Sequence, residues 1–237
     1  MKISSSYKVF LFMGAMLSAI VVSGCLEAPE ASAALLDNDQ LTIHGWLQVG
    51  DPEVSQIEHN ITKNTVLTMS LIKVKYQDEE ISSVVGGGIQ NVTSRLHIDS
   101  KQAFPAPTII TYRITMPGGK KLPLETFSSL MSPSVERTNR DNNISSLRWG
   151  NTTELQLDNG NNANAFFYKG NFSGNGSYVG ILGMVVTYND ENSSTMIIGF
   201  VPDGKFAVQL GDSRKELLFI DGRKELEEMT DLIQTVE

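Results

Sequence analysis

The sequence predicts an α+β fold, in which a short middle helix and a C-terminal helix pack on a mainly antiparallel β-sheet. In the second half of the chain, six apolar, β-rich runs alternate with short connections rich in Asn, Asp and Gly. Connections this short join antiparallel neighbours. The last fifteen residues, "RKELEEMTDLIQTVE", place apolar side chains at helical spacing against a charged face. An all-β sandwich is the alternative fold.

The N-terminus has the three parts of an export signal. Lys2 and Lys8 precede an apolar run over 9–22. Small residues follow this run up to Cys25. The quartet Val-Ser-Gly-Cys at 22–25 resembles the lipobox of prokaryotic lipoproteins, in which the cysteine thiol takes a lipid and becomes the first mature residue. We therefore predict a signal peptide over 1–24 and a lipid anchor on Cys25. The protein is then expected on the extracytoplasmic face of the cell membrane.

Two other interpretations of this segment stay open. Cys25 is incidental if the signal is an ordinary secretory one, and the protein is then secreted. Alternatively, residues 9–26 give 18 largely apolar residues, which is long enough for an uncleaved membrane anchor. Each interpretation leaves the rest of the chain outside the cytoplasm.

Charge and cysteine content exclude several function classes. The precursor has a net charge of −8, and removing residues 1–24 leaves 17 Lys and Arg against 27 Asp and Glu, a net −10. An acidic surface argues against nucleic acid and anionic lipid headgroups as partners. Because Cys25 is the one cysteine, the folded part has no disulfide, thiolate zinc site or cysteine nucleophile.

The remaining chain divides into a tether and one domain. Residues 25–40 mix Glu, Ala, Pro and Ser without periodicity, which predicts a lipid-anchored tether. No repeat or second linker follows, so 41–237 is predicted to be a single β-rich globular domain.

Seven Asn-X-Ser/Thr triplets are candidate glycosylation sites, more than chance predicts for this composition. They start at Asn60, Asn91, Asn143, Asn151, Asn171, Asn175 and Asn192. Turn asparagines that happen to precede Ser or Thr are the alternative explanation. A lipobox combined with many such triplets indicates an archaeal surface protein. Because glycans hinder close contact, we expect a partner surface away from the 171–177 turn, on the strands around Trp46 and Tyr76.

The first half of the domain is expected to contain three strands. Two are predicted at 41–50 and 64–77, with a turn or one short helical turn at 50–60 between them. The run 82–99 contains three consecutive glycines, which favours a strand with a bulge or kink over a phosphate-binding loop.

A strand, a Pro-Gly-Gly turn and a short helix are predicted over 107–131. Pro123 suits a first helical turn, and apolar residues recur at helical spacing up to Met131. A polar connection is expected at 132–151. Six strands follow, at 153–157, 165–172, 177–188, 195–201, 205–210 and 216–220. The final helix is expected to bury Leu226, Met229, Ile233 and Val236.

The order of these elements, with "LRWGNTTELQLDNGNNANAFFYKGNF" and "GSYVGILGMVVTYNDENSSTMIIGFVPDG", resembles an uncharacterised family of archaeal lipoproteins best represented in halophiles. More distantly it is similar to the PsbP-like α/β/α sandwich. The resemblance implies an antiparallel sheet with helices on its faces. Because the family has no established chemistry, it assigns no functional residue.

The sequence contains no pattern that predicts a catalytic, cofactor-binding or metal-binding residue. His44, His59 and His97 have no metal-pair spacing, and no Gly-X-Ser-X-Gly elbow is present. The loop "DNGNNAN" at 158–164 is expected to be an Asx-turn rather than a calcium loop. Acidic pairs such as Glu79–Glu80 are expected on solvated turns. The aromatic residues Trp46, Trp149, Phe166, Phe167 and Tyr168 are expected in the core rather than on a ligand face.

The leading hypothesis is therefore a lipid-anchored extracytoplasmic envelope protein with a non-enzymatic binding or assembly role. An envelope protein is the expected partner, besides the membrane reached through Cys25. The alternatives are an extracytoplasmic hydrolase with a dispersed site and a small-ligand-binding lipoprotein.

Overall fold

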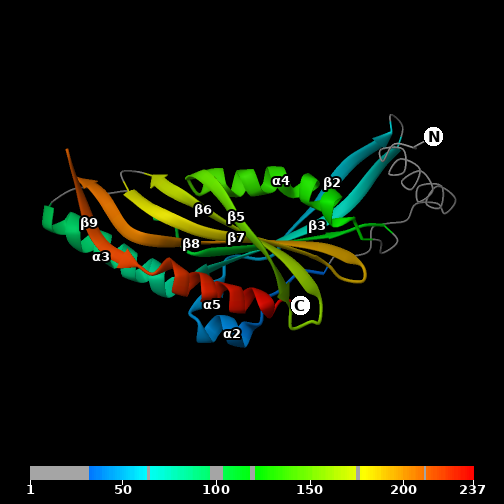
Figure 1. Cartoon of the computed structure of the whole chain (residues 1–237), viewed down its shortest axis with the longest axis horizontal. Coiled ribbons are helices and arrows are strands. Elements are labelled where there is room, and N and C mark those ends of the chain that lie inside the picture. Colours follow the sequence, from blue (N-terminus) through cyan, green and yellow to red (C-terminus); the bar gives the residue numbers. More distant parts are fainter. Residues whose placement is uncertain (1–31, 63–64, 97–103, 118–120, 175–176, 211) are drawn as a thin grey trace.

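A nine-stranded antiparallel sheet carries helices on both faces (Figure 1). The computed structural model describes residues 32–62, 65–96, 104–117, 121–174, 177–210 and 212–237. The predicted signal peptide, Cys25, Asn175 and His97 lie outside the described residues. In the described part of the chain, no helix is long and apolar enough to cross a membrane.

In the first half of the described chain, three helices alternate with four strands. Five consecutive strands and a last helix follow. The elements are α2 (Asn38–Ile43), β1 (Trp46–Gln48), β2 (Glu53–Thr62), β3 (Thr65–Asp78), α3 (Glu79–Leu96), β4 (Thr108–Thr115), α4 (Leu124–Asp141), β5 (Ile144–Gln156), β6 (Asn162–Gly174), β7 (Ser177–Asn189), β8 (Ser193–Leu210), β9 (Ser213–Ile220) and α5 (Gly222–Gln234).

Strand β8 organises the sheet, whose path is β1-β3-β4-β8-β7-β6-β5. It spans 18 residues and pairs with β7 along most of its length. Its other edge pairs with β4 over its first half and with β9 over its second half. At the far edge, β1 and β2 both pair with β3. The predicted mainly antiparallel sheet is confirmed, and its few helices are consistent with an α+β fold.

Strand β4 shows how the two faces of the sheet form two cores. All eight of its residues are buried, so neither face is open to solvent there. Ile110, Tyr112 and Ile114 belong to the core beneath α4, and Ile109 belongs to the core beneath α2 and α5. Alternation along a strand therefore gives each face its own apolar layer.

Helix α5 packs on the sheet through the face that the sequence predicts. Met229, Ile233 and Val236 are fully buried, and Leu226 packs at the margin. The helix approaches β8 so closely that a Cβ placed on Gly199 would lie 2.5 Å from Met229 Sδ. The absence of a side chain at Gly199 is what allows this close packing.

The buried Arg113 of β4 joins both ends of the described chain to the sheet. Its guanidinium donates to the carbonyl oxygens of Ala33 and Glu237 and to the hydroxyl oxygens of Thr195 and Tyr188. A guanidinium has five N–H donors and remains charged, so its burial requires several acceptors. These acceptors come from segments far apart in the sequence.

The predicted tether is wrong for its second half, because residues 33–40 belong to the folded domain. Ala34 and Leu36 are buried against the sheet. The Leu36 amide donates to Tyr76 Oη at 3.2 Å, and Thr111 Oγ1 donates to the Ala34 carbonyl at 2.8 Å. The domain therefore begins before residue 41.

The strand predicted at 41–50 is instead the end of α2 followed by β1. Asp37 caps this helix, since its Oδ1 accepts from the Gln40 amide at 2.8 Å. Gly45, with a φ of +71°, reverses the chain after the helix. The turn predicted at 50–60 is also wrong, because β2 begins at Glu53 and pairs along β3. Pairing with an apolar neighbouring strand outweighs the weak local pattern there.

The strand predicted at 82–99 is wrong, because α3 covers most of this segment. Asp78 Oδ1 accepts from the Ile81 amide at 3.0 Å and so caps the helix. Ile81 and Val85 pack inward one turn apart, and Gly88 lies beside Leu218 of β9. Each glycine costs about 1 kcal/mol in a helix, so the cap and this packing must offset the three glycines.

The connection predicted at 132–151 is largely α4 and β5. The predicted buried positions Phe127 and Met131 are confirmed, but the helix continues through Pro133 to Asp141. Val135 and Thr138 are buried and extend the same apolar face by two turns. This packing explains why the proline does not end the helix.

Ile233→Asp is expected to destabilise the fold by about 3 kcal/mol or more, because it places a charge in a fully buried apolar contact. Thermal and urea denaturation of the full chain measure this change. Asp231→Asn alters an exposed position on the same helix and serves as the matched control. Equal melting temperatures for Ile233→Asp and wild type would contradict the docking of α5.

Candidate functional site

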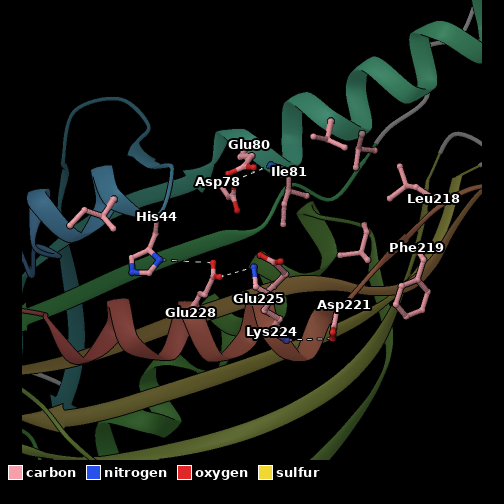
Figure 2. A pocket seen from close by; sticks show the side chains of 14 residues that line it. His44, Asp78, Glu80, Ile81, Leu218, Phe219, Asp221, Lys224, Glu225 and Glu228 are labelled. Carbon is pink, nitrogen blue, oxygen red and sulfur yellow. Dashed lines mark hydrogen bonds and ion pairs between the residues drawn. The ribbon is translucent and has the colours of Figure 1, made fainter.

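A polar pocket of about 350 Å³ lies where α2, α3, β9 and α5 meet (Figure 2). Helix α2 contributes its C-terminal end, α3 and α5 contribute their first two turns, and β3 and β9 contribute their last residues. The main-chain amide of Glu79 donates to the Gly45 carbonyl at 3.0 Å and holds α3 against the end of α2. We refer to this site as the acidic pocket. Its lining residues are Ile43, His44, Asp78, Glu80, Ile81, Val84, Val85, Leu218, Phe219, Ile220, Asp221, Lys224, Glu225 and Glu228.

Two of its five carboxylates cap helices. Asp78, only 3% exposed, accepts from the Ile81 amide at the start of α3. Asp221 accepts from the amides of Arg223 and Lys224 at the start of α5. Carboxylates at these positions satisfy unpaired amides and interact favourably with the positive end of the helix dipole.

The remaining carboxylates face a single lysine and a single histidine. Glu228 Oε1 lies 3.0 Å from Lys224 Nζ, and its Oε2 lies 4.0 Å from His44 Nδ1. Glu80 and Glu225 have no such ion pair among the described residues. The pocket therefore holds an excess of negative charge.

This excess appears in the titration of the carboxyl groups. Burial raises the pKa of Asp78; the Ile81 amide opposes this, while the charges of Glu80 and Glu228 raise it further. Burial also raises the pKa of Glu225, and the neighbouring Glu228 adds to the shift. A cation placed among these groups would relieve the repulsion.

Apolar side chains surround the acidic pocket and stay exposed. Ile43 is 71% exposed, Val84 is 61% exposed and Phe219 is 70% exposed. Each belongs to a different element, so the three form a rim rather than one helix face. Contiguous exposed apolar patches are typical of surfaces that contact other molecules.

None of the candidate glycosylation asparagines that the structure describes lines this pocket. Asn143, Asn151, Asn171 and Asn192 are exposed, on or next to β5 and β6 or in the β7–β8 turn. Two others belong to regular elements, Asn60 to β2 and Asn91 to α3.

The residues considered for chemistry have mixed positions. His44 is the C-cap of α2 and lines the pocket, where a purely structural role was expected; His59 lies in β2. Asn159 Oδ1 accepts from the Asn161 amide, which confirms the Asx-turn. In the residues that the structure describes, no group of three or more His, Cys, Asp or Glu side chains is arranged to hold a metal ion.

The aromatic residues divide between core and surface. Trp46 and Tyr168 are buried as expected, and burial raises the pKa of Tyr168. Trp149 is exposed and stacks at an angle against Tyr168, with 5.4 Å between ring centroids. Because Trp46 and Tyr76 are both buried, their side chains do not offer the partner surface that was expected around them.

The sequence contained one local signal for the acidic pocket, in Asp78-Glu79-Glu80. An acidic residue followed by more acidic residues is typical of a helix start, but the glycines that follow obscured it. Tertiary packing brings this helix start close to Asp221 and His44, so no sequence motif predicts the pocket.

Comparison of the chain with protein-family models, curated proteins and solved structures found no match.

Asp78→Asn is expected to raise the melting temperature by a few degrees at pH 7. A carboxyl whose pKa is higher in the folded than in the unfolded chain destabilises the fold once ionised. This cost is absent at low pH and develops as the pH rises from about 4 through the raised pKa of the folded state. The asparagine Oδ1 still accepts from the Ile81 amide, so the helix cap is retained.

Denaturation of Asp78→Asn and wild type between about pH 3 and pH 7 checks this expectation, with the exposed Asp51→Asn as control. The difference between Asp78→Asn and wild type is expected to disappear at the acidic end. A variant less stable than wild type at pH 7 would show that the charge of Asp78 stabilises the pocket.

Proposed function

We propose that this protein is a lipid-anchored extracytoplasmic envelope protein that binds a basic, partly apolar segment of another envelope protein in the acidic pocket. The role is non-enzymatic binding or assembly. The observation that carries the proposal is the combination of five carboxylates with an exposed apolar rim in one pocket.

Charge and shape both favour a protein segment as the occupant. Small-molecule pockets are usually deep and lined mainly by apolar side chains. The acidic pocket instead surrounds its charged centre with Ile43, Val84 and Phe219, which are exposed. A lysine or arginine entering between Glu80 and Glu225 would gain an ion pair, and apolar neighbours on the same segment would contact the rim.

The extracytoplasmic localisation is part of the same proposal. The export signal, Cys25 and the surface asparagines support an archaeal lipoprotein, and four sequon asparagines have exposed side chains. Helices on both faces of an antiparallel sheet also support the more distant PsbP-like likeness. An uncleaved anchor and a secreted form are the alternatives for the N-terminus.

A second candidate function, an extracytoplasmic enzyme, is favoured by one specific observation. Asp78 and Glu225 both have raised pKa values and line one pocket with His44, an arrangement suited to proton transfer. Against this, none of the described residues lining the pocket is a serine, threonine or cysteine, so a nucleophilic hydroxyl or thiol must come from elsewhere. A small-ligand-binding lipoprotein is a third alternative.

Cys25→Ser is expected to release the protein from membranes or to leave an unprocessed, heavier precursor. The thiol is the acceptor of the lipid, and a hydroxyl does not replace it in this modification. Fractionation and intact-mass measurement in an archaeal expression host test the change. If wild type stays membrane-bound with a mature N-terminus other than residue 25, the lipid anchor is excluded.

The binding proposal is tested with an amphipathic lysine–leucine peptide as the probe. We expect the full chain to bind it, and Glu225→Gln and Phe219→Ser each to weaken binding several-fold. Raising the salt concentration should weaken binding to wild type more than to Glu225→Gln. Glu154→Gln and Val54→Ser remove an exposed charge and an exposed apolar group elsewhere, and are the matched controls.

Fluorescence anisotropy of the labelled peptide measures these affinities. A photo-crosslinker at Val84, compared with one at Val54, tests the same surface in cells. If Glu154→Gln weakens binding as much as Glu225→Gln does, the peptide responds only to the net charge of the protein. That result would remove the pocket from the proposal.

A further inference from the structure

A second hollow, of about 510 Å³, lies between the C-terminal half of α4 and strands β2, β3 and β4. We refer to it as the basic hollow. It is on the α4 face of the sheet, because Ile110 and Tyr112, which line it, belong to the core beneath that helix. Three cationic side chains line it, namely Lys73, Lys75 and Arg137.

The two lysines are placed together by the alternation of β3. Lys73 and Lys75 are two residues apart on one strand, so their side chains share a face. Lys73 Nζ has a partner in Glu53 Oε2 of β2 at 3.0 Å. For the Lys75 ammonium, the described residues provide no hydrogen bond or ion pair.

Lys75 therefore carries a half-buried charge at a cost to stability. Burial lowers the pKa of Lys75, and the neighbouring charge of Lys73 lowers it further, while Glu53 partly opposes both effects. Long cationic side chains normally extend into water or find an anion. Here the charge faces a hollow that also contains the guanidinium-bearing residue Arg137.

The charges across the basic hollow do not balance within the chain. Three cations face Glu53 and Asp141, and Glu53 is already engaged by Lys73. On the α4 side, Tyr112 Oη and Thr138 Oγ1 lie 3.2 Å apart and add hydroxyl groups to the wall. The chain as a whole is acidic, with a net charge of −8, so this local excess of positive charge runs against the overall composition.

We propose that the basic hollow binds a small oxyanion, with a phosphate or carboxylate group held between Lys75 and Arg137. A planar guanidinium pairs with two oxygens of such a group, while an ammonium acts as a compact charge. The volume lies in the range of small-ligand sites. This site is independent of the acidic pocket, since the two share no lining residue.

Calorimetric titration of the full chain in mild neutral detergent tests the proposal, with inorganic phosphate and citrate as separate probes and sodium chloride at equal ionic strength as the reference. We expect saturable binding of at least one probe. Lys75→Met and Arg137→Gln should each weaken it about tenfold or more, as expected for a lost charge-assisted hydrogen bond. Lys169→Met, at an exposed position on β6, should leave it unchanged.

Two measurements of melting temperature distinguish lost binding from a folding defect. Lys75→Met is expected to melt no lower than wild type without the probe, because it removes a half-buried charge. The probe is expected to raise the melting temperature of wild type but not of Lys75→Met. Phosphate binding alone assigns a phosphoryl ligand, and citrate binding alone assigns a polycarboxylate. No binding of either probe, or binding unaffected by Lys75→Met and Arg137→Gln, would overturn the proposal.

Discussion

The burial of one guanidinium constrains the centre of this fold. Arg113 lies within the α5 face of the sheet, where an unpaired charge would be strongly destabilising. Its acceptors come from the start of the described chain, from β7 and β8, and from Glu237. Asp190, 3.8 Å away, adds the counter-charge. Burial alone would raise the pKa of Asp190, but hydrogen bonds from Ser193 and Asn192 and the charge of Arg113 lower it. The register of β4, β8 and β7 and the positions of Ala33 and Glu237 are thus tied to one side chain.

Strand β3 separates charge of opposite sign across the sheet. In "KVKYQD" the odd positions place Lys73 and Lys75 on the α4 face, at the basic hollow. The even positions bury Val74 and Tyr76 on the α5 face and end at Asp78, in the acidic pocket. The two-residue period of a strand is sufficient to produce this separation. An acidic protein can thereby hold a cationic site and an anionic site on the same strand, on opposite faces of the sheet.

The sequence predicted the parts of the fold that depend on local pattern. Short polar turns identified most strands of the second half, but the two strands predicted at 195–201 and 205–210 are one strand, β8, because pairing with β7 continues on both sides of the expected turn. The apolar face of α5 was predicted correctly at Met229 and Ile233. Helix α3 was missed because its three glycines are tolerated only through the Asp78 cap and contact with β9. Helix α2 was also missed, although Asp37 followed three residues later by Gln40 is a sequence pattern typical of a helix start. The acidic pocket combines residues near 44, 80 and 225, a juxtaposition that no local pattern contains.

The docked segment before α2 has a mechanical consequence. If Cys25 carries the lipid, eight residues separate it from the buried Ala34, so the two are about 30 Å apart at most. A pull from the membrane is then transmitted to Ala34 and Leu36, which are held laterally by β3 and β4. The Leu35 carbonyl also accepts from the Glu237 amide, so the same load reaches the far end of the chain. Such a lateral attachment breaks in shear, with several bonds loaded together, rather than by peeling one bond at a time. If the protein is lipid-anchored, these contacts would carry force from the membrane into the sheet.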